Sequence, residues 1–340
     1  MNPPNRNRHG VRKPWVPLFL FAVMTAQASA APQPFIPWRS LHNPVLSYPH
    51  WSIKDAAMAY RRGVFYVFFS AFYYDHGRVR SHVAEVSTRD FKSYSQPILD
   101  FDGERTGWIG MCSPDVQKVG KVWELSFNSW GDDPERPDQL FYMTSSDLVH
   151  WSARHPLAPN LTAGQGVIDL SVTKTPSGYY AIWKQGRNPR QMRPRLATAP
   201  HLDGPWRFVG SGYPSLLMAD GRENGLIHEN FEFVWIGGVL HLLSSDYPHG
   251  HHEYLYTLLK PSHPLEWGKG FELKIPGQSF NRLVHCDAAA LYDWRRYDGH
   301  FYLIYAGRNE QTTYLHRGWN RLGLARSKDL HHWVPAGWAR

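Results

Sequence analysis

One short unit recurs five times along this chain: a turn glycine followed by a strand-like run of aromatic and aliphatic residues. Each repeat has room for about four short strands separated by turns, and no long window shows a helical period. Repeats of this length with four strands are typical of β-propeller blades. The sequence therefore predicts an all-β fold, a five-bladed β-propeller of four-stranded antiparallel blades. The five glycines are Gly63, Gly120, Gly178, Gly238 and Gly299, spaced 57, 58, 60 and 61 residues apart.

A second element follows in most repeats and supports the same fold. Ser or Thr precedes an Asp and an apolar residue, with an aromatic residue three positions later, as in Thr88 to Tyr94, Ser146 to Trp151 and Ser327 to Trp333. Polar turns that end in an aromatic residue are typical of hairpins. A two-sheet sandwich, the competing all-β fold, does not explain a fivefold period.

The N-terminal segment has the pattern of an export signal. Basic residues up to Lys13 precede an apolar stretch, Val16–Ala26, and the small-residue sequence Ala28–Ala30. This is the order found in a cleaved signal peptide. The apolar stretch is about half of the roughly 20 residues that span a bilayer. We expect residues 1–30 to be a signal peptide and 31–340 a single propeller domain. The protein would be periplasmic or secreted, with no membrane span after signal removal.

The charge distribution bears on whether the protein binds nucleic acid, and the cysteine content bears on whether a disulfide stabilises it. The formal net charge is +8, but the basic residues are scattered and no nucleic-acid motif accompanies them. We therefore expect no nucleic-acid partner. Cys112 and Cys286 fall in the second and fifth repeats, which are not neighbours in a ring of five. The fold is not expected to depend on a disulfide.

Three repeats carry an acid at similar distances before the turn glycine. Asp55 precedes Gly63 by 8 residues, and Asp169 and Glu229 each precede their glycine by 9. Equivalent starts of inner strands converge at one mouth of a propeller channel. Cleavage of a glycosidic bond needs a pair of carboxyl groups, and a third can tune the pKa of the acid. Calcium ligation and turn capping are the alternatives for these acids, and Glu232 is a rival acid in the fourth repeat.

Short motifs around these acids resemble glycoside hydrolase family 43, and more widely the propeller families 32, 62, 68, 117 and 130. The resemblance implies that Asp55 is the general base, Asp169 the pKa modulator and Glu229 the general acid of an inverting enzyme. It favours arabinose- or xylose-type oligo- or polysaccharide substrates. The chain is a divergent member, with Ala56 and Leu170 where the family usually has proline. The matching segments are Lys54-Asp55-Ala56-Ala57-Met58, Ser113-Pro114-Asp115-Val116, Ile168-Asp169-Leu170-Ser171-Val172, His228-Glu229-Asn230-Phe231 and Ala325–Trp333.

Four further residues are candidates for substrate binding: Trp51, Asp115, His285 and Asp287. Trp51 precedes the first-repeat acid and could stack on a sugar ring. Asp115 stands only 5 residues before Gly120, and Asp287 could be the fifth copy of the acid. The resemblance places His285 in the channel near an ion or substrate. No cofactor is required, and a structural calcium ion in the channel is the one ion considered.

Two other function classes remain open from the sequence. One is a non-catalytic carbohydrate-binding propeller, although such proteins usually repeat the same ligand residues in every blade. Here the position reads Asp, Asp and Glu in three blades and differs in the others. The other is a different propeller glycosidase or transferase, of fructoside or anhydrogalactoside type. We expect a glycoside hydrolase acting on O-glycosyl bonds.

Overall fold

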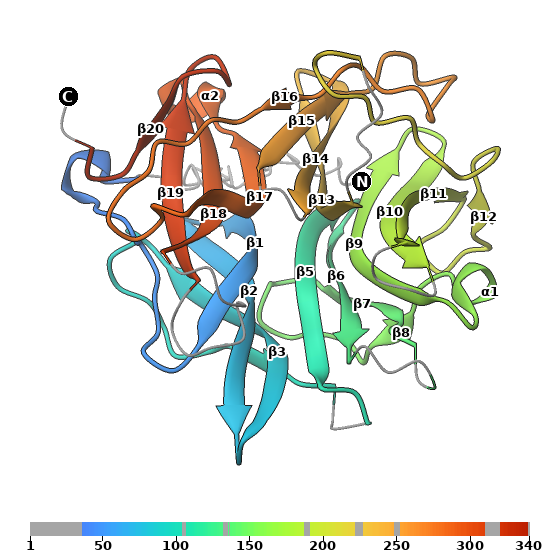
Figure 1. The fold of residues 1–340 in the computed structure, drawn as a ribbon, viewed down its shortest axis with the longest axis horizontal. Coiled ribbons are helices and arrows are strands. Elements are labelled where there is room, and N and C mark those ends of the chain that lie inside the picture. Colours follow the sequence, from blue (N-terminus) through green and yellow to red (C-terminus); the bar gives the residue numbers. More distant parts are fainter. Residues whose placement is uncertain are drawn as a thin grey trace, which may run out of the picture. The chain divides into compact units, whose positions relative to one another are not determined.

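The described strands form five four-stranded antiparallel blades (blades I to V) that follow one another in chain order around a common centre (Figure 1). The predicted five-bladed propeller is therefore confirmed. The structure is a computed structural model and describes residues 36–338, except 104–106, 132–134, 136, 187–190, 222–226, 248–251 and 310–319. The expected signal peptide, residues 1–30, lies outside the described residues.

Blades I and II share one hydrogen-bonded sheet through a parallel pair, Ser81 and Gly110. A Cβ atom at Gly110 would lie 1.7 Å from the carbonyl oxygen of Ser81, so this close approach requires glycine. The strands of these blades are β1 (Ser52–Arg61), β2 (Val64–Asp75), β3 (Arg78–Thr88), β4 (Leu99–Phe101), β5 (Gly110–Val119), β6 (Val122–Trp130), β7 (Leu140–Ser145) and β8 (His155–Pro156).

Blades III to V are separate sheets, each with four strands in sequence order. Among the described residues, three short helices lie between strands or before β1: η1 (Trp38–Ser40), α1 (Pro159–Thr162) and α2 (Arg295–Asp298). The strands are β9 (Gly166–Thr175), β10 (Gly178–Gly186), β11 (Arg193–Ala199), β12 (Arg207–Phe208), β13 (Ile227–Ile236), β14 (Val239–Tyr247), β15 (Glu253–Thr257), β16 (Phe271–Glu272), β17 (Val284–Asp293), β18 (Phe301–Arg308), β19 (Arg321–Ser327) and β20 (Trp333–Pro335).

The repeat glycines lie where the sequence predicts, at the connection between the first and second strands of successive blades. All five have positive φ, from 66° at Gly120 to 144° at Gly178. They do not occupy the same place within that connection, however. Gly63 directly precedes β2, Gly120 comes two residues before β6, and Gly178 is the first residue of β10.

The Ser/Thr-Asp elements form the expected polar turns between the third and fourth strands. In blade I, Thr88 Oγ1 accepts hydrogen bonds from the backbone N–H groups of Asp90 and Phe91. Ser145 and Ser327 do the same in blades II and V. In each turn the apolar residue adopts a positive φ. Phe91 and Leu148 are buried, and Leu330 is partly buried.

Apolar side chains between adjacent blades make up the core. Separate clusters join blades I and II, II and III, III and IV, and IV and V. A fifth packs Phe65 and Val67 of blade I against Tyr302 and Ile304 of blade V. The segment before β1 also pairs with the last blade, because Leu46 forms a bridge to Leu322. The first and last blades are thus held together by packing and by this segment.

Two remaining expectations concern cysteines and membranes. Cys112 and Cys286 are buried and free. That the fold does not depend on a disulfide for its stability stays a prediction. Among the described helices, none has the length and hydrophobicity needed to cross a membrane.

Candidate active site

The first strand of every blade contains a β-bulge that turns one residue into the left-handed region of backbone space. A bulge inserts one residue into a strand and re-aims the side chains beside it. All five left-handed residues lie in the N-terminal half of their strand, away from the turn glycine. The left-handed residues are Asp55 (φ 54°), Ser113 (54°), Asp169 (61°), Asn230 (53°) and Ala288 (47°).

This bulge defines which residues are equivalent, and it corrects the predicted register of Glu229. Asp55 and Asp169 occupy the same bulge position, as expected. The equivalent residue in blade IV is Asn230, and Glu229 precedes it by one position. Counting from the glycines caused the error, because they stand at different places in their turns. Glu229 instead matches Lys54 of blade I and Asp287 of blade V.

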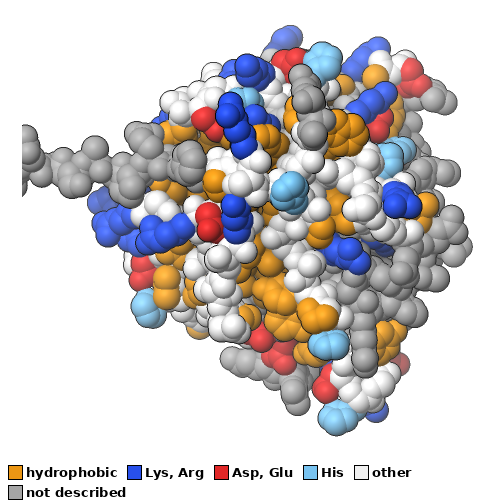
Figure 2. All heavy atoms as spheres, turned by 90° about the vertical axis from the view of Figure 1, so that its left-hand side faces the viewer, with side chains coloured by type: hydrophobic (Ala, Val, Ile, Leu, Met, Phe, Trp, Pro, Cys, Tyr) orange, Lys and Arg blue, Asp and Glu red, His pale blue; other side chains and the backbone are white. Residues whose placement is uncertain are grey.

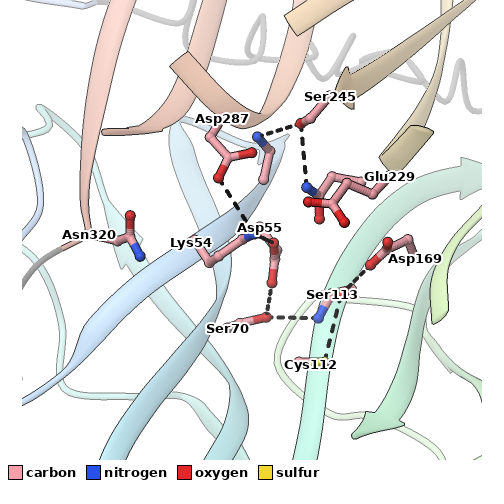
Figure 3. A network of polar contacts seen from close by, with 12 residues as sticks. Lys54, Asp55, Ser70, Cys112, Ser113, Asp169, Glu229, Ser245, Asp287 and Asn320 are labelled. Carbon is pink, nitrogen blue, oxygen red and sulfur yellow. Dashed lines mark hydrogen bonds and ion pairs between the residues drawn. The ribbon is translucent and has the colours of Figure 1, made fainter. Parts of the chain in front are cut away.

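Two of the predicted catalytic carboxyl groups, Asp55 and Asp169, are nevertheless joined by a chain of buried hydrogen bonds, and Glu229 lies beside them (Figure 3). Ser70 Oγ donates to Asp55 Oδ2 at 2.6 Å and accepts from the backbone N–H of Ser113 at 2.7 Å. Ser113 Oγ then donates to Asp169 Oδ1 at 2.9 Å. Asp55 of blade I and Asp169 of blade III are therefore connected through the bulge of blade II.

Lys184, near the end of β10, extends this network to Glu229. Its Nζ atom lies 2.7 Å from Glu229 Oε2 and 3.4 Å from Asp169 Oδ2, so these two oxygens are at most 6.1 Å apart. The lysine and Asp169 are each 5% exposed at the side chain, and Glu229 is 14% exposed. Glu229 is thus the most accessible of the three.

Residues at the Lys184 position elsewhere in the ring show why this lysine is distinctive. Ser70, Asn128 and Ser245 are its counterparts in blades I, II and IV. Each accepts a hydrogen bond from the bulge residue of the next blade, at 2.7 to 2.9 Å. Lys184 instead places a cation in the channel, directed at the next blade's carboxylate.

The surroundings of Asp55 and Glu229 shift the pKa values of these two carboxyl groups in opposite directions. Burial raises the pKa of Asp55 to about 6, and Lys54 and Ser70 only partly oppose this. Burial would also raise the pKa of Glu229, but Lys184 and Lys54 together outweigh it and lower that pKa below its usual value. Around neutral pH, Glu229 is ionised and Asp55 titrates just below neutrality.

A second lysine links blade I to blade V. Lys54 Nζ lies 3.4 Å from Asp55 Oδ1 and 3.5 Å from Asp287 Oδ2, and both partners are buried. Asp287, predicted as a binding residue, therefore belongs to the same cluster as the predicted catalytic acids. Its charge helps to raise the pKa of Asp55.

Asp115 and Glu232 each stand two residues after the bulge residue of their strand. All five blades line a hollow of about 20 Å³ beside them, enough for about one water molecule. Asp115 Oδ2 accepts a hydrogen bond from Ser171 at 2.6 Å, and burial raises its pKa to about 7. Glu232 Oε2 accepts one from the backbone N–H of Leu291 at 2.7 Å. Glu232 thus fastens blade IV to blade V.

Trp51 and His285 lie outside the polar network of the carboxyl groups. The Trp51 ring packs against Tyr48 and His82, with centroids 4.7 Å and 4.8 Å apart. His285 is exposed, and its Nε2 atom lies 3.1 Å from the carbonyl oxygen of Arg282. Their role in substrate binding stays a prediction.

Sequence reasoning missed Lys54, Lys184 and Ser70. Lys54 directly precedes Asp55, and Lys184 interrupts the apolar run of β10 immediately after Trp183. A charged residue within an otherwise apolar strand is costly to bury, and this feature of the sequence could have identified both lysines. Among the described residues, no group of three or more His, Cys, Asp and Glu side chains is arranged to hold a metal ion.

Comparisons with known proteins support the fold. No protein-family model and no curated protein matches the sequence. Solved structures do. An α-L-arabinofuranosidase from Lactobacillus brevis has a TM-score of 0.61 and 12% identity, over 87% of this chain and 98% of that one. A thermostable family 43 glycoside hydrolase has a TM-score of 0.56 and 11% identity, over 88% and 96%. A family 32 β-fructofuranosidase from Bombyx mori has a TM-score of 0.57 and 17% identity, over 82% and 61%.

These structures share the fold of this chain. The propeller expected from the resemblance is therefore the one found in solved glycoside hydrolases. Identities of 11–17% leave the activity and substrate of this chain to be argued from its own residues.

Proposed function

We propose that this protein is a glycoside hydrolase that cleaves O-glycosidic bonds of oligo- or polysaccharides. The observation that carries the proposal is the polar network from Asp55 through Ser113 and Asp169 to Glu229. Carboxyl groups so close together destabilise a fold unless they are paired, and they are the groups that glycosidic cleavage uses. The fold shared with solved glycoside hydrolases adds support.

The roles follow the family resemblance. Asp55 takes a proton from water, whose oxygen forms the new bond to the anomeric carbon. Glu229 gives a proton to the leaving oxygen as the glycosidic bond breaks. Asp169 acts on Glu229 through Lys184, because the lysine contacts both carboxylates and can be held by Asp169 when Glu229 carries a proton.

The proton balance of this pair has a kinetic consequence. The reactive form holds one proton on the pair, on Glu229, whereas the lowered pKa of Glu229 and the raised pKa of Asp55 favour that proton on Asp55 in the free enzyme. A pH profile gives two apparent pKa values for the pair and does not assign either value to one residue. A separate experiment must therefore distinguish the acid from the base.

Leaving-group dependence makes that distinction. Wild-type, Asp55→Asn and Glu229→Gln proteins would be assayed on dinitrophenyl and unactivated glycosides, with arabinofuranosides, xylosides and fructosides in the panel. A dinitrophenolate leaves without protonation. Glu229→Gln should therefore lose about 100- to 10,000-fold on unactivated substrates and little on activated ones. Asp55→Asn should lose activity on both. Hydrolysis of unactivated glycosides by Glu229→Gln at the wild-type rate would exclude Glu229 as the acid.

Arabinose- or xylose-type substrates are proposed first, and export to the periplasm or medium is proposed from the N-terminal pattern. A structural calcium ion in the channel also stays a proposal. The pairing of Glu229 with Lys184 favours one second candidate, a non-catalytic sugar-binding propeller, since a neutralised carboxylate binds hydroxyl groups without donating a proton. Binding of a saccharide without hydrolysis of any member of the panel would favour that candidate.

A further inference from the structure

A large hollow lies on the outer edge of blade V, formed by segments other than those of the channel. Its volume is about 780 Å³, within the range of about 300–1,000 Å³ usual for small-ligand sites. Residues around η1, the end of β19, the β19–β20 turn and the segment after β20 line it. We call it the blade V pocket. The residues that carry the inference are Trp38, Arg39, Arg326, Lys328, Asp329 and Trp338.

The charge of this pocket is positive. Arg39 and Lys328 are exposed, and within the described part of the chain neither forms an ion pair. Asp329 is the one acidic residue of the lining. Its Oδ1 atom accepts the backbone N–H groups of His331 and His332 at 2.9 and 2.8 Å, and its Oδ2 atom lies 2.7 Å from the His332 ring. The Asp329 carboxylate thus makes its hydrogen bonds within its own turn and does not pair with Arg39 or Lys328.

Two tryptophans provide flat apolar surfaces beside these cations. The guanidinium of Arg326 lies over the Trp38 ring, 4.5 Å from its centroid, so both groups are held in place. Trp338 is 45% exposed, so part of its ring is open to solvent. Figure 2 shows this side of the molecule, where Lys and Arg side chains are more abundant than Asp and Glu.

An indole face stacks on the C–H face of a sugar ring, and guanidinium and ammonium groups bind carboxylate or sulfate. We propose that the blade V pocket binds an acidic saccharide that carries carboxylate or sulfate groups. Trp338 would stack on a sugar ring, while Arg39 and Lys328 would pair with its anionic groups. The proposal concerns binding outside the channel and holds whether or not the channel cleaves the bound chain.

Titration calorimetry on the full-length protein tests it. The probes are a galacturonate oligosaccharide, a sulfated galactan oligosaccharide and a neutral arabinan oligosaccharide of matched length. We expect the two acidic probes to bind and the neutral one to bind at least tenfold more weakly at this site. The acidic probe that binds more tightly identifies the anionic group. Equal binding of the neutral probe, abolished by Trp338→Ala, would overturn the acidic specificity.

Variants at the pocket and at matched surface sites complete the experiment. The double variant Arg39→Gln/Lys328→Gln, and separately Trp338→Ala, should each weaken acidic-probe binding at least tenfold. Arg207→Gln/Lys260→Gln removes the same charge from exposed positions elsewhere, and Trp235→Ala removes a similarly exposed indole, 39% exposed. These controls should bind as the wild type does. Equal weakening by both double variants, or tighter binding of a DNA duplex than of either acidic sugar, would overturn the proposal.

Discussion

Lys184 Nζ lies 2.7 Å from Glu229 Oε2, and this buried ion pair joins the second strand of blade III to the first strand of blade IV. The lysine stands where three other blades carry a serine or asparagine that accepts a backbone hydrogen bond. It keeps Glu229 ionised against the effect of burial. The protonation of the proposed acid is therefore controlled from the neighbouring blade.

Replacing Lys184 by Met should move the acidic limb of the kcat/KM profile to higher pH. Without the cation, burial dominates and the pKa of Glu229 rises. The mono-protonated pair then forms at higher pH, and more of its proton resides on Glu229. Lys184→Arg keeps a positive charge and should leave the limb near its wild-type position. If the acidic limb lies at the same pH in both variants, Glu229 is not one of the two carboxyl groups that take part in the reaction.

The alkaline limb of the same profile should lie at about pH 6. The pKa of Asp55 is about 6, and above that pH the pair loses the single proton that hydrolysis requires. Activity should therefore fall as the pH rises from 6 to 8, measured with an unactivated glycoside at substrate concentrations well below KM. Asp287→Asn removes a charge that raises this pKa and should shift the limb downward. A profile that stays level to pH 8 contradicts the assignment.

Replacing Gly110 by Ala should destabilise the fold by about 2–3 kcal/mol, because the new Cβ would overlap the carbonyl of Ser81 and push blades I and II apart. Urea unfolding measures the change. Gly131→Ala is a matched control at the same open end of the β5–β6 hairpin, since its Cβ would meet nothing closer than 3.6 Å. Similar stability of the two variants would show that the Ser81–Gly110 pair is dispensable.

Neither cysteine should react with a thiol reagent until the protein unfolds. Cys112 and Cys286 are buried, and burial raises the pKa of both thiols well above the usual value. The unreactive thiol form therefore dominates at neutral pH. Thiol titration should find no fast-reacting group in the native protein and two in denaturant, and reductant should leave Tm unchanged. Rapid modification of either thiol in the native state would contradict this burial.

The repeat pattern was enough to predict the blades, because a turn glycine and an apolar run recur wherever a first strand turns into a second. It was not enough to align the channel residues. Gly63 and Gly238 directly precede the second strand, whereas Gly178 is the first residue of it, so counting from the glycines misaligned Glu229 with Asp55 and Asp169 by one residue. Lys184 also escaped notice. Its importance depends on a contact with the next blade, which no local pattern records.

The five bulges separate the shape of the channel from its chemistry. At this position the backbone takes the left-handed form whether the side chain is Asp, Ser, Asn or Ala. That form costs roughly 1–2 kcal/mol for a residue such as Ala288, so packing between blades imposes it rather than local preference. The backbone conformation of each bulge therefore does not depend on which of these side chains it carries. A sequence change at Ser113, Asn230 or Ala288 could install a new functional group on the axis with no change in the course of the chain, which gives this ring an inherent capacity to acquire new substrates.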